Sequence, residues 1–442
     1  MGLIPSFGGL IYTIIAFVVA LSIIVAVHEY GHYIVGRWSG IHAEVFSLGF
    51  GPVLYTRTDK RGTRWQIAAL PFGGYVKFMG DADAASAKDG AAISALSPAD
   101  RRRTMHGAPL WARAATVAAG PGFNFIFAIL IFTGFFMLRG VATETPVVGA
   151  LKPLPALADV LQPGDAILAM GGIPTPDNDA FYAAVEKLPA TATIAYHIRR
   201  GSAEMDVLGP FPFPPLADAV QPGSPAAGLN MQAGDVVLSV DAVPIATFRE
   251  LREKVAASDG KPLALQVWRN GETLDLALTP RRMDIPTAAG GFETRWLIGL
   301  SGGLFYTPEI RHPGPVEAVG SAAWQTYDIM RTSLSGLWHM ITGAISTCNL
   351  SGPIGIAETS SAAAAQGAMT FIWFIAVLST AVGLMNLFPI PVLDGGHLVF
   401  HAYEALTRRP PSDRALRVLM GTGLVLLLSL MAFALTNDLF CP

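Results

Sequence analysis

The apolar residues of this chain are concentrated in long stretches without charge. Four stretches contain no Asp, Glu, Lys or Arg: residues 2–27, 114–138, 359–393 and 418–437. A helix of about 20 apolar residues crosses the hydrocarbon core of a bilayer. The pattern therefore predicts four membrane-spanning helices, at roughly 7–33, 113–138, 368–388 and 417–436. The corresponding segments of the chain are 1–36, 113–139, 368–396 and 417–436.

The segment 37–112, between the first two helices, has a β-rich first half. Residues 43–79 predict β-hairpins, with turns at Asp59–Gly62 and at Pro71–Gly74. These strands are apolar, and β edges enter a membrane only where protein buries them or where they line a cavity. We expect a membrane-associated, re-entrant sheet, followed by a flexible cytoplasmic loop over 80–103.

A segment of the chain occurs twice between the second and third helices. Gln162, Gly164-Asp165 and Leu168 recur 70 residues later as Gln232, Gly234-Asp235 and Leu238, and Arg199 with Gly201 recurs as Arg269 with Gly271. Short β-branched runs, Gly/Pro turns and one helical stretch per copy (180–188 and 247–257) predict two small α/β domains, 141–214 and 215–290. Apolar residues three or four apart then predict an amphipathic helix over 316–345, at the outer membrane surface or against the other helices.

The composition agrees with a multi-pass α-helical membrane protein, and the net charge excludes one class of partner. Hydrophobic residues make up 52% of the chain and charged residues 14%, against about 25% charged in ordinary soluble domains. The net charge of −3 provides no basic field, so nucleic acid is not an expected partner. Loops 36–113 and 397–417 are rich in Lys and Arg, which predicts that both are cytoplasmic. The segment 140–361 then lies on the opposite side.

His28-Glu29-Tyr30-Gly31-His32 is an HExxH motif at the end of the first apolar stretch. Residues four apart share one face of a helix, so both imidazoles can bind one metal ion, and the glutamate can reach a metal-bound water. Ionisable groups in a membrane span are costly unless they are paired or functional. The alternative is a helix that has simply reached the membrane interface at His28.

A catalytic zinc site uses three protein ligands and keeps one position open. Asp394 is the candidate third ligand, because it ends the third uncharged run and the predicted topology delivers it to the same face as the two histidines. Its alternative role is an interfacial helix cap, and His397 is the rival ligand. The remaining histidines considered are scattered and predict no further site: His42, His106, His197, His312 and His339.

The motifs together resemble a known family. HEYGH, NLFPIPVLDGGH at 386–397 and the repeats between them resemble the site-2 protease family of intramembrane zinc metalloproteases, and the tandem repeats resemble its Gram-negative RseP type. The sequence SPAAGLNMQAGDVVLSVDAVPI at 224–245 resembles a bacterial PDZ domain, whereas the first copy lacks the Ala-Gly step. The resemblance implies Zn²⁺ held by His28, His32 and Asp394, with Glu29 activating the water.

The resemblance also implies three substrate-binding elements. They are Asn124 in a Gly-x-x-x-Asn pattern, Asn386 in an Asn-x-x-Pro pattern, and the Gly73-Gly74 hairpin. A hydrogen bond between helices is the alternative role for Asn124. A cap of a broken helix is the alternative for Asn386.

The implied function is hydrolysis of peptide bonds in the transmembrane segment of single-pass membrane proteins. Examples are a pre-cut anti-sigma factor or a remnant signal peptide, in the bacterial inner membrane. The PDZ-like domains are then periplasmic and bind a peptide or chain end, or act as a steric screen, and the active site lies near the cytoplasmic face. The alternatives are a catalytically silent zinc-binding membrane scaffold that recruits partners through its PDZ-like domains, which has no need of Glu29, and a metal transporter, which usually shows more broken helices.

Overall fold

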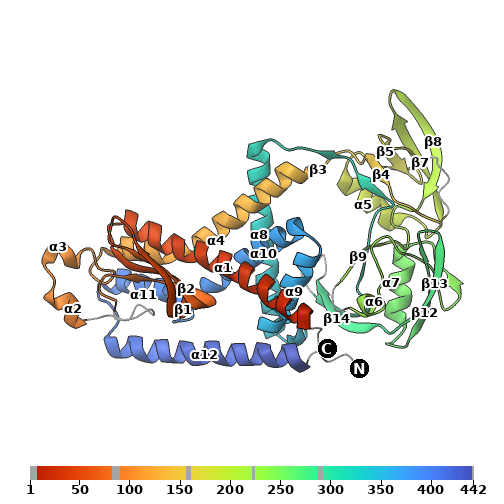
Figure 1. Cartoon of the computed structure of the whole chain (residues 1–442). Helices are drawn as coiled ribbons and strands as arrows, with labels where there is room; N and C mark the ends of the chain where they lie inside the picture. Colours follow the sequence, from red (N-terminus) through yellow and green to blue (C-terminus); the bar gives the residue numbers. More distant parts are fainter. Residues whose placement is uncertain (1–6, 82–89, 156–160, 222–223, 287–291, 441–442) are drawn as a thin grey trace. The chain divides into compact units, whose positions relative to one another are not determined.

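The structure is a computed structural model that describes residues 7–81, 90–155, 161–221, 224–286 and 292–440 (Figure 1). The parts of the predicted segments that fall in the gaps between these ranges, such as 82–89 in the expected flexible loop, lie outside the described residues. The chain forms two compact units. One combines the residues up to Phe135 with Pro315–Trp338 and the chain from Thr347 onward, and the other combines Phe136–Gly314 with His339–Ser346.

Among the described residues of the first unit, four helices are long and apolar enough to cross a membrane. They are α1 (Phe7–Trp38), α4 (Leu110–Arg139), α10 (Ala368–Asn386) and α12 (Asp413–Phe440). Each coincides with one of the uncharged stretches. Helix α8 (Pro315–Ile341) is amphipathic and ends four residues before the predicted boundary at 345; among the described residues it is not a candidate span.

The segment predicted as 368–396 is not one element. Helix α10 ends at Asn386, and Asp394 begins a separate helix, α11 (Asp394–Thr407). Pro389 and Pro391 interrupt the helical hydrogen bonds between them. Three further short helices occur where the sequence analysis predicted none: α9 (Pro353–Ala365), α2 (Gly90–Ala95) and α3 (Pro98–Arg101). The last two occupy part of the segment expected to be a flexible loop.

Strands β1 (Ala43–Thr58) and β2 (Arg64–Phe78) form the predicted sheet beside α1 (Figure 1). The turn at Asp59–Gly62 is present, and the Asp59 carboxylate accepts the backbone N–H groups of Arg61 and Thr63. The turn expected at Pro71–Gly74 is not a hairpin turn. Residues 45–48 lie between 64–67 on one side and 74–77 on the other, so the chain crosses there from one side of this central segment to the other.

The second unit contains the two repeats, whose described residues include in each copy a four-stranded sheet and an equivalent ten-residue helix. The first has strands β5 (Ala166–Met170), β6 (Ile173–Pro174), β7 (Thr193–Arg200) and β8 (Ala203–Pro210) with α5 (Asn178–Lys187). The second has β10 (Val236–Val240), β11 (Val243–Pro244), β12 (Leu263–Arg269) and β13 (Glu272–Leu278) with α7 (Phe248–Ala257). The strand orders β6-β5-β7-β8 and β11-β10-β12-β13 are equivalent.

One residue pairing of the predicted repeat is wrong. Asp165 forms an ion pair with Arg200, at 2.7 Å, and its counterpart Asp235 forms one with Arg269, at 2.6 Å. Arg200 rather than Arg199 therefore corresponds to Arg269. The offset changes from 70 to 69 because the second copy is one residue shorter between its second and third equivalent strands.

The two predicted domains, which end at 214 and 290, are also too short. The chain after the second sheet returns as β16 (Leu300–Gly302), β17 (Tyr306–Pro308) and β18 (Ile310–Arg311), which pair with β9 (Ala217–Val220), β4 (Val148–Leu151) and β3 (Val141–Ala142). The core of the first repeat includes Leu304, Phe305 and Tyr306, and that of the second includes Ile298. The remaining elements are α6 (Pro225–Gly228), β14 (Arg281–Pro286), β15 (Phe292–Leu297) and a 3-10 turn at Thr347–Asn349.

Candidate metal centre

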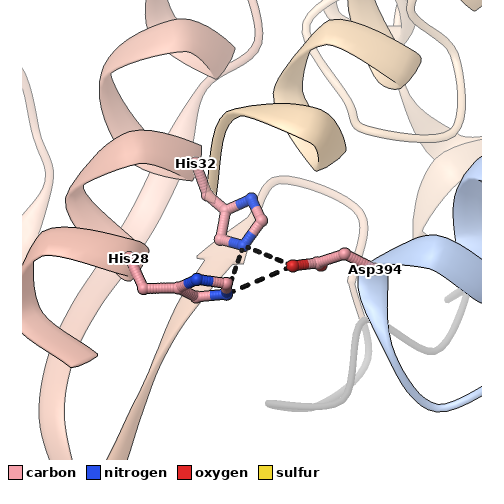
Figure 2. A group of neighbouring side chains, drawn as sticks. All are labelled: His28, His32 and Asp394. Carbon is pink, nitrogen blue, oxygen red and sulfur yellow. Dashed lines mark hydrogen bonds and ion pairs between the residues drawn. The ribbon is translucent and has the colours of Figure 1, made fainter. Parts of the chain in front are cut away.

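Two histidines of one helix and an aspartate far away in the sequence bring metal-binding atoms together in the first unit. One ligand atom each of His28, His32 and Asp394 lies within 4.8 Å of the others. Oδ2 of Asp394 is 3.1 Å from Nε2 of His28 and 3.5 Å from Nε2 of His32, and the two Nε2 atoms are 3.2 Å apart (Figure 2). Ligands about 2.0–2.1 Å from a tetrahedral zinc are about 3.3 Å apart, so the three atoms fit such a site. Oδ2 of Asp394 is buried without a hydrogen bond, which a cation would satisfy.

Helix α1 supplies both histidines from one face, four residues apart, as the HExxH spacing predicts. The Nδ1 atom of His32 lies 2.8 Å from the carbonyl oxygen of Thr116 on α4. A proton on Nδ1 makes this a hydrogen bond and leaves Nε2 free to bind a metal. The neighbouring helix thus fixes both the orientation and the tautomer of His32.

Asn124 plays the corresponding part for His28. Its side chain is fully buried, its amide lies 3.2 Å from Nδ1 of His28, and its Oδ1 has no partner within the described parts of the chain. A histidine that binds metal through Nε2 needs an acceptor for the proton on Nδ1. Turning the amide by 180° places Oδ1 at this contact, which provides the acceptor and gives the buried oxygen a partner.

The packing of α1 on α4 depends on small residues beside the histidines. A Cβ on Gly120 would overlap the imidazole of His32 and lie 2.8 Å from the ring of His28. A Cβ on Gly31 would lie 2.5 Å from the carbonyl oxygen of Ala119. These glycines let the helix backbones approach closely enough for α4 to contact both rings.

Asp394 is delivered by the turn between α10 and α11. It is the first residue of α11, and the two glycines that follow it pack on the turn. A Cβ on Gly395 would overlap the carbonyl oxygens of Leu387 and Phe388, and one on Gly396 would overlap that of Ile390. The Asp-Gly-Gly sequence therefore holds the carboxylate close to the turn. His397, the rival ligand, is not part of the described metal-binding group.

Glu29 is on α1, and its side chain faces strand β2 of the sheet. Its carboxylate accepts a hydrogen bond from the backbone of Val76 in β2. A Cβ on Gly74 would lie 3.2 Å from Cγ of Glu29, so the strand runs close to this side chain. Gly73 has a φ of +143°, and a Cβ there would overlap the ring of Phe50. Of the predicted Gly73-Gly74 pair, Gly74 is thus beside Glu29, whereas Gly73 is beside Phe50.

Asn386 makes its hydrogen bond within its own helix rather than with the metal-binding residues. Its amide donates to the carbonyl oxygen of Val382, one turn earlier in α10, at 3.0 Å. In the part of the chain that the structure describes, no hydrogen bond joins it to the two histidines or Asp394. It is the last residue of α10, and the cap position of this helix belongs to Leu387.

Sequence reasoning missed a second polar cluster, in which His401 of α11 joins Asp81, after β2, and His106, before α4. Oδ1 of Asp81, Nε2 of His106 and Nε2 of His401 are buried without a hydrogen bond among the described residues, and His106 lies 3.4 Å from Asp81. Burial, assisted by nearby Arg113, lowers the pKa of His401 to about 4, so this imidazole is neutral at physiological pH. The spacing of His397 and His401, four residues apart, was the available signal.

Comparison with known proteins shows the family of the chain. Residues 16–430 match peptidase family M50. A protein of Rhizobium meliloti named "putative zinc metalloprotease" is 37% identical over 432 residues, 97% of this chain and 96% of its own. The regulator of sigma-E protease RseP is 35% identical in Salmonella typhimurium, over 459 residues, and 34% identical in Escherichia coli, over 458 residues; both matches cover 97% of this chain and 98% of the relative.

The family match and the four apolar helices are those of a membrane-associated metallopeptidase. The chain belongs to peptidase family M50, the site-2 protease family. It is therefore a metalloendopeptidase, and its metal is zinc.

Proposed function

We propose that His28, His32 and Asp394 hold the zinc ion, and that the chain hydrolyses peptide bonds within the transmembrane segments of single-pass membrane proteins. The observation that carries the proposal is the convergence of the three ligand atoms at the end of an apolar helix that is long enough to span a bilayer. Three polar ligands at such a place are costly unless they bind an ion.

Zinc, when bound, polarises a carbonyl and lowers the pKa of a bound water. Glu29 follows His28 on α1 and acts as the general base, taking the proton of the water on its carboxylate and passing it to the leaving amine. The backbone of Val76 orients this carboxylate through its hydrogen bond. Asn124 and Thr116 hold the two imidazoles in the tautomer that binds metal.

A helical substrate hides its carbonyl groups in i to i+4 hydrogen bonds, so it must unwind before it is cleaved. The strand segment at Gly74–Val76 runs beside Glu29 and offers an edge on which an extended substrate can pair. The distal part of the sheet is apolar and exposed, which suits insertion beside lipid: Phe50, Val53, Leu54, Tyr55 and Leu70. Asn386 is assigned to the substrate side of the turn that carries Asp394.

The second unit is assigned to substrate selection. Its repeats are taken as tandem PDZ-like domains, which bind an extended chain end or screen bulky substrates sterically. The relatives named regulators of sigma-E protease suggest that the substrate of this chain is an anti-sigma factor whose outer domain has already been cut. A remnant signal peptide is also a substrate of this kind, because it too is a short apolar helix in the membrane. Lys and Arg in the loops 36–113 and 397–417 support a cytoplasmic active site and periplasmic PDZ-like domains in a bacterial inner membrane.

The test is cleavage of a pre-trimmed single-pass substrate by the purified chain in detergent, with mass spectrometry to locate the bond. Wild type is expected to cleave within the transmembrane segment, and E29Q to bind zinc without cleaving. Removal of the metal with a chelator should stop cleavage, and added Zn²⁺ should restore it. Equal cleavage by wild type and E29Q would contradict the proposal. No cleavage of any substrate in a panel, with zinc bound, would favour a zinc-binding scaffold.

A further inference from the structure

Three arginines from separate segments of the first unit converge on one cavity of about 370 Å³. Arg37 is in the last turn of α1, Arg61 is in the turn between β1 and β2, and Arg103 follows α3. His42 also lines the cavity. We call this site the basic cavity. Neither zinc binding nor peptide hydrolysis requires it.

The walls of the basic cavity are held by hydrogen bonds of the main chain. The backbone N–H of His42 donates to the carbonyl oxygen of Arg103, at 2.9 Å, which ties the segment after α3 to the start of the sheet. The hydroxyl of Thr63 donates to the carbonyl oxygen of Ala43, at 2.8 Å, which ties the turn to the same strand. Thr63 and Tyr33 are buried and line the cavity. The backbone around the three arginines is therefore held in place by hydrogen bonds before any ligand binds.

Positive charge in the basic cavity is not neutralised by nearby carboxylates. Among the described residues, no carboxylate lies within ion-pair distance of Arg37 or Arg61. Arg103 has only Asp100, at 3.8 Å, and both side chains are about half exposed, so this pair contributes little. Two further carboxylates lie close in the sequence and have other partners: Asp59 accepts hydrogen bonds from two backbone N–H groups and from the indole of Trp65, and Glu44 pairs with Lys77 at 3.8 Å.

An anion with several oxygens fits this arrangement. Guanidinium groups bind phosphate through paired N–H donors, and several of them around one cavity favour a doubly or singly charged phosphate group over a carboxylate. The last carbonyl groups of α1, which would repel an anion, already accept hydrogen bonds from Ser39, Gly40 and Ile41. The helix end therefore presents arginine rather than free carbonyl oxygens.

The position of the basic cavity selects the source of the phosphate. The candidate span Gly9–Trp38 ends beside it, and the end of a membrane-spanning helix is where hydrocarbon gives way to headgroups. Trp38 is 72% exposed next to Arg37, as aromatic residues are at membrane interfaces. We propose that the basic cavity binds the phosphate group of an anionic phospholipid in the leaflet that meets this end of α1. The proposal depends on α1 spanning the membrane, and not on proteolysis.

The test is a titration of the purified full chain in a non-ionic detergent, by calorimetry, with three ligands. They are dioctanoyl phosphatidylglycerol, dioctanoyl phosphatidylcholine and inorganic phosphate, each below the concentration at which the lipids form micelles. The variant is R37Q/R61Q/R103Q. The control is R57Q/R64Q/R102Q, which removes the same charge from exposed arginines of the same loop that do not line the cavity.

We expect saturable binding of phosphatidylglycerol that is about 100-fold weaker in the cavity variant and unchanged in the control. The single variant R61Q changes only an exposed turn residue and is expected to weaken binding about fivefold, which provides a test if the triple variant does not fold. Equal losses in the cavity and control variants would overturn the proposal by showing a diffuse charge effect. Equal affinity for inorganic phosphate would overturn the assignment to lipid, and equal affinity for phosphatidylcholine would overturn the preference for an anionic one.

Discussion

Gly120 of α4 lies so close to the imidazole of His32 that a Cβ at this position would overlap the ring. The two residues are 88 positions apart in the sequence, and their contact sets how near α4 comes to the HExxH turn. G120A is expected to displace His32 and to lower zinc occupancy, with loss of cleavage. Two residues later, a Cβ on Gly122 meets nothing within 4 Å. G122A is therefore the matched control, and zinc content by mass spectrometry should separate the two. Full zinc in G120A would show that the helices are not so closely packed.

Asn124 gives a second prediction about the same site. If its amide oxygen accepts the proton on Nδ1 of His28, N124D keeps an acceptor and N124L removes it. We expect N124L to bind zinc about 10–100-fold more weakly and N124D to bind it almost as wild type does. A zinc-competition titration measures this directly. A role in substrate binding alone would leave the zinc affinity of both variants unchanged.

Gly74 tests the contact between the sheet and Glu29. A Cβ there would lie 2.8 Å from the carbonyl oxygen of Ser47 and 3.2 Å from Cγ of Glu29. G74A is expected to push the strand away from Glu29 and to lower cleavage at least tenfold while zinc stays bound, since loss of a positioned general base costs about 10²–10⁴-fold in rate. G134A, in an open position on α4, is the control. Unchanged cleavage by G74A would contradict the placement of this strand at the catalytic base.

The Asp165–Arg200 pair predicts a pH dependence in the first repeat. Burial alone would raise the pKa of Asp165, but the hydrogen bonds from Arg200 and from the backbone of Gln162, together with the charge of Arg200, outweigh burial and hold the pKa below its ordinary value of 3.8. Because the folded pKa is lowered, the pair stabilises the domain above pH about 4, and this contribution is lost as the pH falls below 4.

D165N should therefore lower the free energy of unfolding at pH 7, because it removes the charge that pairs the buried Asp165 carboxylate with the partly exposed Arg200. Urea unfolding of the segment 141–311 at pH 7 and pH 3 measures the effect, and the difference from wild type should shrink at pH 3. D179N, at an exposed position in α5, is the control. A difference of the same size at both pH values would mean that the Asp165 charge is not responsible.

Strands β16, β17 and β18 follow the second repeat but pair with strands at the start of each repeat. A test of substrate selection must therefore remove these strands together with the repeats. Removal of 141–290 alone would strip the cover from Leu304, Phe305 and Tyr306, which are buried in the core of the first repeat. Replacement of 141–311 by a short linker removes both repeats completely. We expect this variant to cleave a substrate whose outer domain is intact. The full chain is expected not to cleave that substrate. If it still distinguishes intact from pre-cut substrate, the repeats are not the screen.

The metal site was more predictable from the sequence than the domains around it. Helical spacing places His28 and His32 on one face whatever surrounds them, and an isolated carboxylate such as Asp394 after a long apolar run has few structural roles. The contacts of Thr116, Gly120 and Asn124 with these rings depend on how α4 packs, which no local pattern contains. The third strand of each repeat pairs over a long sequence distance, so the shift from Arg199 to Arg200 was not visible from the 70-residue periodicity.

The most direct test of this account is the zinc content of the purified chain, measured for wild type, D394A and H397A. The account predicts one zinc per chain in wild type and in H397A, and much less than one in D394A, because Asp394 shares the site with His28 and His32 while His397 stands outside it. Full zinc in D394A together with loss of zinc in H397A would contradict it, and would show that the wrong residue of α11 had been assigned to the metal.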